Sequence, residues 1–166
     1  MITTQREFYT EEEKQEIVRS LSEYQWDRFL TLTTNRHYEL PDLIKFVRDF
    51  GRRVDGTVGS RSNYFLVISG EEFDPILGRD KVRPFNTRLH IHGVLGGVGD
   101  VSNEKIQKCW RAVETTVTPL PNLTFTLPNT LGFSKVTHFD NRPEGFFYLL
   151  NQTKRGYILT NTEVRV

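Results

Sequence analysis

The stretch Arg88-Leu89-His90-Ile91-His92-Gly93-Val94-Leu95 has the alternation of a β-strand that carries two histidines on one of its faces. Side chains alternate between the two faces of a strand, so His90 and His92 point to the same side of the sheet. The apolar residues Leu89 and Ile91 then point to the other side, into the core. Two neighbouring imidazoles on one sheet face can bind one divalent metal ion, and this is the hypothesis that the rest of the sequence has to support.

Size and composition indicate one soluble globular domain. The chain has 166 residues, of which 37% are hydrophobic and 26% charged, and its formal net charge is +1. A charge so close to neutral means that any nucleic-acid binding must depend on local basic patches. The single cysteine, Cys109, excludes an internal disulfide and a multi-cysteine zinc site, and its apolar surroundings predict a buried position. We find neither a signal peptide nor a membrane-spanning segment and expect a cytoplasmic protein.

Helical periodicity, capping residues and β-branched runs predict the order of the elements along the chain. In the first part of the chain we expect a helix from the capping box at Thr10 to about Tyr24, a strand over 26–34, a helix from Pro41 to about Gly51 and a polar loop over 52–63. A strand over 64–69 and a long connection over 71–87 then lead to the histidine strand. After it we expect a helix that is capped by Ser102 and reaches Val117, a strand within 130–139, and a closing helix from about Pro143 to Arg155, with Asn141 as its N-cap and Gly156 as its stop.

This order predicts an α+β fold, namely the ferredoxin-like or split βαβ arrangement, because β-α-β-β-α-β is flanked by one helix at each end. In that arrangement two helices pack on one face of an antiparallel sheet. The other face is then open for a site, with the closing helix placed against it. We interpret residues 1–166 as a single domain with a core over about 26–156 and an N-terminal helical extension over 1–25.

A third metal ligand is expected on the strand next to the histidines. In the alternating set Phe65, Val67, Ser69 and Glu71 the polar residues begin earlier than in the other set, so we place this set on the site face and choose Glu71. A β-bulge at Gly70 would exchange Glu71 for Glu72. Two imidazoles and one carboxylate leave coordination positions open and favour manganese or magnesium over zinc. Such an ion can polarise a phosphodiester oxygen.

Tyr148 is the candidate nucleophile. In the closing helix, Phe146, Leu149 and Leu150 can pack against the sheet, whereas Tyr148 is the one phenol within the helix. Its hydroxyl, with an ordinary pKa of about 10, is a weak nucleophile, and a nearby cation that polarises the acceptor would compensate for this. Tyr157, just beyond the helix, is the alternative.

Three segments in this order resemble the motifs of the HUH endonucleases: Phe29-Leu30-Thr31-Leu32-Thr33, His90-Ile91-His92-Gly93-Val94-Leu95 and Gly145-Phe146-Phe147-Tyr148. More narrowly, they resemble the rolling-circle replication initiator (Rep) proteins of plasmids, phages and small viruses. The resemblance covers about residues 26–155, and its middle motif is the most specific. The tyrosine follows the histidines, as in initiators and small single-strand transposases, whereas in conjugative relaxases it precedes them.

The resemblance implies that Tyr148 attacks a phosphodiester of single-stranded DNA at a replication origin, leaving a 5′-phosphotyrosine and a free 3′-hydroxyl. His90, His92 and Glu71 would be the metal ligands. Host replication proteins such as a helicase and a polymerase would be partners, in the cytoplasm, or in the nucleus for a eukaryotic virus. The sequence departs from the family at one position, because the lysine that commonly follows the tyrosine by three residues is Asn151 here.

DNA contacts are predicted at basic residues near these motifs. Gln152 lies one helical turn from Tyr148 and can touch the phosphate or a metal-bound water. The candidate phosphate contacts are Arg36, Arg79, Lys81, Arg83, Arg88, Lys154 and Arg155. Tyr38 and Phe85 are candidates for stacking on bases, and His37 and His138 are interpreted as structural or surface residues.

Three other functions remain open at this point. A single-strand transposase of the same superfamily would share the chemistry. A non-catalytic ferredoxin-like module would bind nucleic acid on its open sheet without any reaction. A structural metal-binding domain would hold the ion without turnover.

Overall fold

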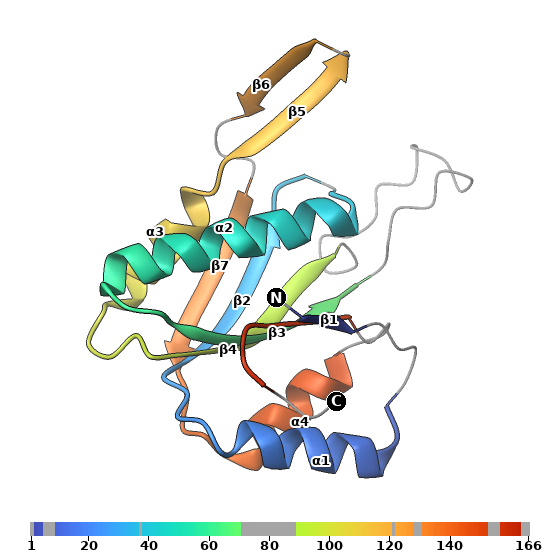
Figure 1. Ribbon diagram of the computed structural model, residues 1–166, viewed down its shortest axis with the longest axis vertical. Coiled ribbons are helices and arrows are strands. Elements are labelled where there is room, and N and C mark those ends of the chain that lie inside the picture. The colour runs from blue at the N-terminus through green and yellow to red at the C-terminus, as the bar shows by residue number, and fades with distance from the viewer. Residues whose placement is uncertain are drawn as a thin grey trace.

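The computed structural model describes residues 2–4, 9–36, 38–70, 89–120, 122–127, 131–152 and 157–163. Over these residues the main feature is a six-stranded sheet with the strand order β1-β8-β3-β4-β2-β7, in which all neighbouring strands are antiparallel. A separate two-stranded hairpin, β5-β6, projects from the body of the molecule (Figure 1). The predicted α+β class with an antiparallel sheet is therefore confirmed.

The elements have the following bounds. The strands are β1 (Ile2–Thr4), β2 (Arg28–Thr34), β3 (Asn63–Ser69), β4 (His90–Gly96), β5 (Thr115–Leu120), β6 (Leu123–Leu127), β7 (Leu131–His138) and β8 (Tyr157–Thr160). The helices are α1 (Glu11–Leu21), α2 (Leu40–Val58), α3 (Asn103–Arg111) and α4 (Pro143–Gln152).

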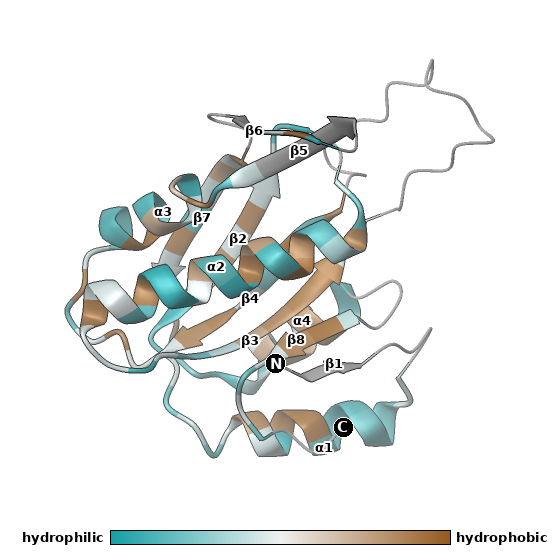
Figure 2. Ribbon diagram, turned by 45° about the horizontal axis from the view of Figure 1, so that its top comes forward, coloured by the Kyte–Doolittle hydropathy of each residue, from teal (hydrophilic) through white to brown (hydrophobic). Residues whose placement is uncertain are grey.

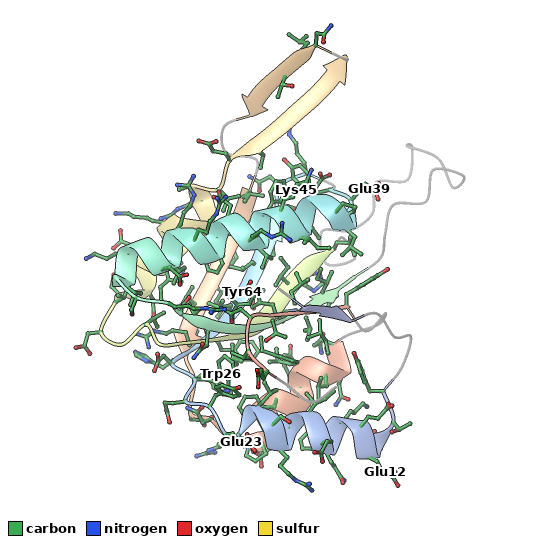
Figure 3. The ribbon with its side chains drawn as sticks, viewed as in Figure 1. Glu12, Glu23, Trp26, Glu39, Lys45 and Tyr64 are labelled. Carbon is green, nitrogen blue, oxygen red and sulfur yellow. The ribbon has the colours of Figure 1, made fainter. Side chains whose placement is uncertain are left out.

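Helices cover both faces of the sheet, α2 and α3 on one side and α1 and α4 on the other (Figure 1). Each pair of helices packs against the sheet over a separate hydrophobic cluster. The cluster under α2 and α3 includes Leu66 and Ile91, and the cluster under α1 and α4 includes Val67 and Val94. Hydrophobic residues, brown in Figure 2, run through the central strands β3 and β4, and β3 is buried from Tyr64 to Ser69. In Figure 3, Tyr64 lies on the α2 side of the sheet and Trp26 on the α1 side.

Two helix boundaries differ from the sequence prediction. Helix α2 does not end near Gly51 but continues to Val58, and its C-cap is Gly59, which has a left-handed φ of 80°. Residues 52–58, predicted as loop, are therefore helical. Helix α3 ends at Arg111 instead of reaching Val117, and Thr115–Leu120 forms a strand instead. The β-branched residues of this segment favour a strand over a helix, so the apolar spacing alone was misleading.

The sequence prediction also missed the strands β1, β6 and β8 and misplaced one cap. Strands β1 and β8 pair with each other, and β8 extends the sheet beside β3. Asn141 does not cap α4; its side chain accepts a hydrogen bond from the backbone N–H of Trp26 and donates one to the carbonyl oxygen of Trp26. The predicted stop, Gly156, lies outside the described residues.

Helix α1 is built as the capping box predicts. The Thr10 hydroxyl accepts from the N–H of Glu13, and the Glu13 carboxylate accepts from the N–H of Thr10. The inner face of α1 is buried, with Ile17 and Leu21 at 1% exposure or less. Across the described part of the chain, no helix combines the length and the apolar character that crossing a membrane requires.

Candidate functional site

His90 and His92 lie on one face of the sheet. In the pairing of β3 with β4, His90 is opposite Ser69 and His92 is opposite Val67. Directly paired residues of antiparallel strands share a face, so this pairing puts both histidines on the side of α1 and α4. Their ring centroids are 4.9 Å apart. The neighbouring Ile91 is fully buried on the opposite face, as the alternation predicts.

His92 is held in its neutral form by its surroundings. Burial in the sheet and the neighbouring His90 lower the pKa of His92 to about 4. The Thr31 hydroxyl, directly across on β2, is 3.2 Å from Nδ1 of this ring. In the tautomer whose Nδ1–H donates to the Thr31 hydroxyl, Nε2 carries the lone pair that can bind another group. A neutral imidazole with one nitrogen fixed by a hydrogen bond is the form in which histidine binds metal ions.

Tyr148 stands over the same part of the sheet. Its helix packs inward through Phe146, Leu149 and Leu150, each at 2% exposure or less, whereas the Tyr148 side chain is 49% exposed. The Tyr148 ring centroid lies 6.3 Å from that of His92 and 6.1 Å from that of Phe29. The structure therefore brings the candidate nucleophile together with the histidine pair.

Tyr157, the alternative nucleophile, is placed elsewhere. It is opposite Ile68 in the sheet, and both belong to the hydrophobic cluster under α2 and α3. Its side chain is only 8% exposed. Tyr157 therefore lies on the face of the sheet away from the histidines and does not take part in this site.

Two contacts hold the C-terminal end of α4 in place. At the C-terminal end, the Ser69 hydroxyl donates a 2.6 Å hydrogen bond to the carbonyl oxygen of Gln152, so the half-buried Gln152 is anchored beside the strand that pairs with His90. At the same end, the Lys14 ammonium of α1 donates to the Asn151 side chain over 3.0 Å. A lysine from α1 thus stands next to the position where the family resemblance expects one on α4.

The predicted third ligand cannot be placed in the same way. Val67 and Ser69 do share the histidine face, as predicted for their alternating set. Gly70 follows with a positive φ of 99°, so the regular alternation ends there, and both Glu71 and Glu72 lie outside the described residues. Within the part that the structure describes, no third histidine, cysteine, aspartate or glutamate gathers with the pair to form a metal-binding group. The two imidazoles alone suit a borderline divalent ion that keeps open positions.

Most of the predicted DNA contacts fall on segments that the structure does not describe. These are Arg79, Lys81, Arg83, Arg88, Lys154, Arg155 and Phe85, together with His37. Arg36 is exposed at the end of β2, and His138 is exposed at the end of β7. Tyr38 is unsuited to stacking on a base, because its ring packs edge-on against Phe46 with the centroids 4.9 Å apart and its hydroxyl is buried.

Two contributors to the site were missed by sequence reasoning. Thr31 and Lys135 lie in line with His92 across three neighbouring strands and on the same face of the sheet. Thr31 of β2 pairs with His92 of β4 on one side and with Lys135 of β7 on the other. Period-two alternation in β2 and β7 gives the parity of these residues, but the neighbours of each strand follow only from the strand order. That order is a property of the whole sheet.

A hollow lies away from this site, between α2 and α3 on the opposite side of the sheet. It measures about 510 Å³ and its lining includes Arg53, Lys105 and Lys108. None of the histidine-face residues contributes to it. Comparisons of the chain with protein-family models, curated proteins and solved structures find no match. The function is therefore argued from the site itself.

Proposed function

We propose that this protein is a metal-dependent nuclease of the HUH type that nicks and rejoins single-stranded DNA through a covalent phosphotyrosine. The observation that carries the proposal is the exposed Tyr148 ring, whose centroid lies 6.3 Å from that of His92, beside a second histidine on the same sheet face. The strand order β3-β4-β2-β7 supports the finer fold assignment, since it is the order of a ferredoxin-like sheet with one β-α-β-β-α-β unit.

The residues divide the work as follows. His90 and His92 would hold Mn²⁺ or Mg²⁺, with Glu71 or Glu72 as the third ligand, and the ion would neutralise charge on the reacting phosphate. The Tyr148 oxygen attacks the phosphorus and releases its proton to solvent, which reaches the half-exposed ring. The bond from phosphorus to the 3′ oxygen breaks, and that oxygen takes up a proton and leaves as a 3′-hydroxyl. Attack by a 3′-hydroxyl on the phosphotyrosine reverses the reaction and rejoins the strand.

The structural contacts explain how a weak nucleophile would be positioned. The hydrogen bond from Ser69 to the Gln152 carbonyl and the buried face of α4 hold Tyr148 above the histidines. Such preorganisation removes the entropic cost of bringing the phenol to the phosphate. The lowered pKa of His92 keeps its ring available as a ligand at neutral pH.

The biological role follows from the order of the motifs. A tyrosine that comes after the histidine pair suits initiation of rolling-circle replication of a plasmid, phage or virus, with origin single strands as substrate and a host helicase and polymerase as partners. A single-strand transposase would use the same site. A binding module without chemistry is a second candidate, favoured by one observation: Phe133 and Tyr148 both expose aromatic rings on this face.

Covalent capture tests the proposal. The protein is incubated with a pool of randomised single-stranded 40-mers and Mn²⁺, and adducts are separated on a denaturing gel. We expect an adduct that requires the metal and disappears in Tyr148→Phe, His90→Ala and His92→Ala. Sequencing the captured DNA would give the cleavage site.

Tyr157→Phe is the matched control, because it removes a buried phenol from the opposite face and should leave the adduct intact. An adduct that survives Tyr148→Phe and is lost in Tyr157→Phe would overturn the assignment of the nucleophile. Binding of the pool without any adduct would leave only the binding module.

A further inference from the structure

The histidine face of the sheet is uncovered over β7, the edge strand beyond β2. Along β7, Phe133, Lys135 and Thr137 are exposed, whereas Ser134 and Val136, which alternate with them, are buried. The buried set faces α3, and Gln107 of α3 donates to the Ser134 carbonyl oxygen. The exposed set shares the face of the histidines, since Lys135 pairs with Thr31 and Thr31 with His92. Helices α1 and α4 thus leave part of this face open.

Phe133 is exposed beyond what the fold requires. Its side chain is 67% exposed. In the described part of the chain, the other exposed large hydrophobic residues are Leu123 and Tyr148. Two of these three residues therefore lie on the face of the histidine pair. Single exposed apolar residues are common, but an aromatic ring beside a cation on a flat sheet is the arrangement that proteins use to bind unpaired bases.

We propose that β7 forms a docking platform for the single strand that is cut, on which an unpaired base stacks on Phe133 and a flanking phosphate pairs with Lys135. This rests on the function proposed above and extends it to the path of the substrate. Lys135 lies two strands from His92, which corresponds to about 10 Å across the sheet. A strand whose reacting phosphate lies at the histidines would therefore place a neighbouring nucleotide over β7. Lys135 forms no ion pair with another described residue, so its charge is available for a phosphate.

Binding of a defined probe tests the stacking contact. The probe is fluorescein-labelled (dT)20, titrated with protein in EDTA so that no chemistry occurs, and binding is followed by fluorescence anisotropy. Phe133→Ala should weaken binding about tenfold, within the range for loss of one stacked base, whereas Phe133→Trp should keep it. The matched control is Leu123→Ala, which removes another exposed hydrophobic residue from the β5-β6 hairpin and should bind like the wild type. Equal binding by Phe133→Ala and wild type would overturn the platform.

The salt dependence of the same titration tests Lys135. Each phosphate contact to a single strand contributes a slope of about 0.7 to the dependence of log K on log salt concentration. We expect Lys135→Gln to make that slope shallower by about 0.7. Lys105→Gln is the control, because it removes a lysine from the hollow on the opposite side of the sheet. A reduced slope in Lys105→Gln with no change in Lys135→Gln would place the DNA on the other face and overturn the proposal.

The platform and the nicking reaction can fail separately. If Phe133→Ala weakens (dT)20 binding and no variant forms a covalent adduct, the platform holds and the enzyme function is wrong. If adducts form as expected but Phe133→Ala and Lys135→Gln bind like the wild type, the enzyme function holds and the platform is wrong. Tyr148→Phe should lose the adduct while keeping most of its affinity for (dT)20.

Discussion

Gly93 directly follows the second histidine at a point where the strands leave no space for a side chain. A methyl group on Gly93 would lie 2.5 Å from the Phe65 carbonyl oxygen and 2.9 Å from the Leu66 Cα of β3. Both are backbone atoms that cannot rotate away. The glycine therefore permits the close approach of β3 to β4 that puts Ser69 and Val67 opposite the histidines.

Gly93→Ala is expected to lower the free energy of unfolding by about 1–3 kcal/mol or more, because the added methyl group overpacks the sheet. Urea denaturation measures this change. Gly56→Ala is the control: nothing lies within 4 Å of its Cβ position in α2, and the change should be neutral or stabilise by about 0.5–1 kcal/mol. A Gly93→Ala protein as stable as the wild type would contradict the close approach of the two strands.

The titration of His92 gives a second prediction at this scale. In the metal-free protein its ring protons should shift in NMR spectra with a midpoint near pH 4, against about 6.5 for an unfolded histidine. Between these two values the unfolded chain binds a proton that the folded protein does not, so this residue makes stability fall as pH drops from 6.5 to 4. In His92→Gln the loss of stability over that window should be smaller. A midpoint above pH 6 would show that His92 is not desolvated as described.

Among the elements, the β5-β6 hairpin differs from the rest because, within the described residues, its two strands pair only with each other. Figure 1 shows it extending beyond α2, away from the main sheet. A two-stranded hairpin without further packing is marginally stable in water. It should therefore open far more often than the central sheet.

Hydrogen exchange checks this expectation. Backbone amides of β5 and β6 should exchange orders of magnitude faster than those of β2 and β4, because opening the hairpin breaks few tertiary contacts. The amides of β4 serve as the internal reference, since β4 pairs on both sides. If the amides of the hairpin were as protected as those of β4, a contact outside the hairpin would have to hold the hairpin closed.

The elements also show what the sequence can and cannot predict. Three features were predictable, because each depends on the spacing of neighbouring residues. They are the side of the sheet to which each residue of the histidine strand points, the inward face of α4 and the capping box of α1. The sequence predicts that the helix ends near Gly51, but this glycine serves packing: a Cβ there would lie 3.2 Å from the Tyr64 ring. Distinguishing a stop from a packing glycine requires knowing what lies opposite, which is tertiary information.

The same limit applies to the candidate site. The sequence predicted His90, His92 and Tyr148, because their spacing and chemistry are local. It predicted Tyr38 for stacking, and the structure instead packs the partly buried Tyr38 against Phe46 and exposes Phe133. Both aromatic residues look alike in sequence. Only the tertiary packing decides which of them remains uncovered beside the histidines.

At the scale of the whole molecule, α1 packs on the face of the sheet that carries the histidines and contributes to the hydrophobic core there. Ile17, Val18 and Leu21 are buried there, and the Trp26 indole donates a hydrogen bond to the Leu21 carbonyl oxygen. Burial of three such side chains contributes about 5–9 kcal/mol as an upper value, which is comparable to the total stability of a small domain. The helix also carries Lys14, which contacts Asn151 of α4.

Deleting residues 1–24 should therefore abolish cooperative unfolding, as measured by thermal denaturation followed with near-UV circular dichroism. A milder variant, Thr10→Ala, removes only the cap of α1 and should cost about 1 kcal/mol. Glu12→Ala, on the exposed side of α1, is the control and should change stability little. A truncated protein that melts as sharply as the full chain would show that α1 is a dispensable appendage.

The pairing of β1 with β8 has a consequence for the connectivity of the chain. Ile2 lies opposite Thr160, so the first and last strands are neighbours at one edge of the sheet, whereas β7 forms the other edge. A short peptide could join these two strands, and new ends could be opened at the tip of the β5-β6 hairpin, where few tertiary contacts would be cut. Such a circular permutant should keep the histidines and Tyr148 in register while its free ends leave from a different part of the surface.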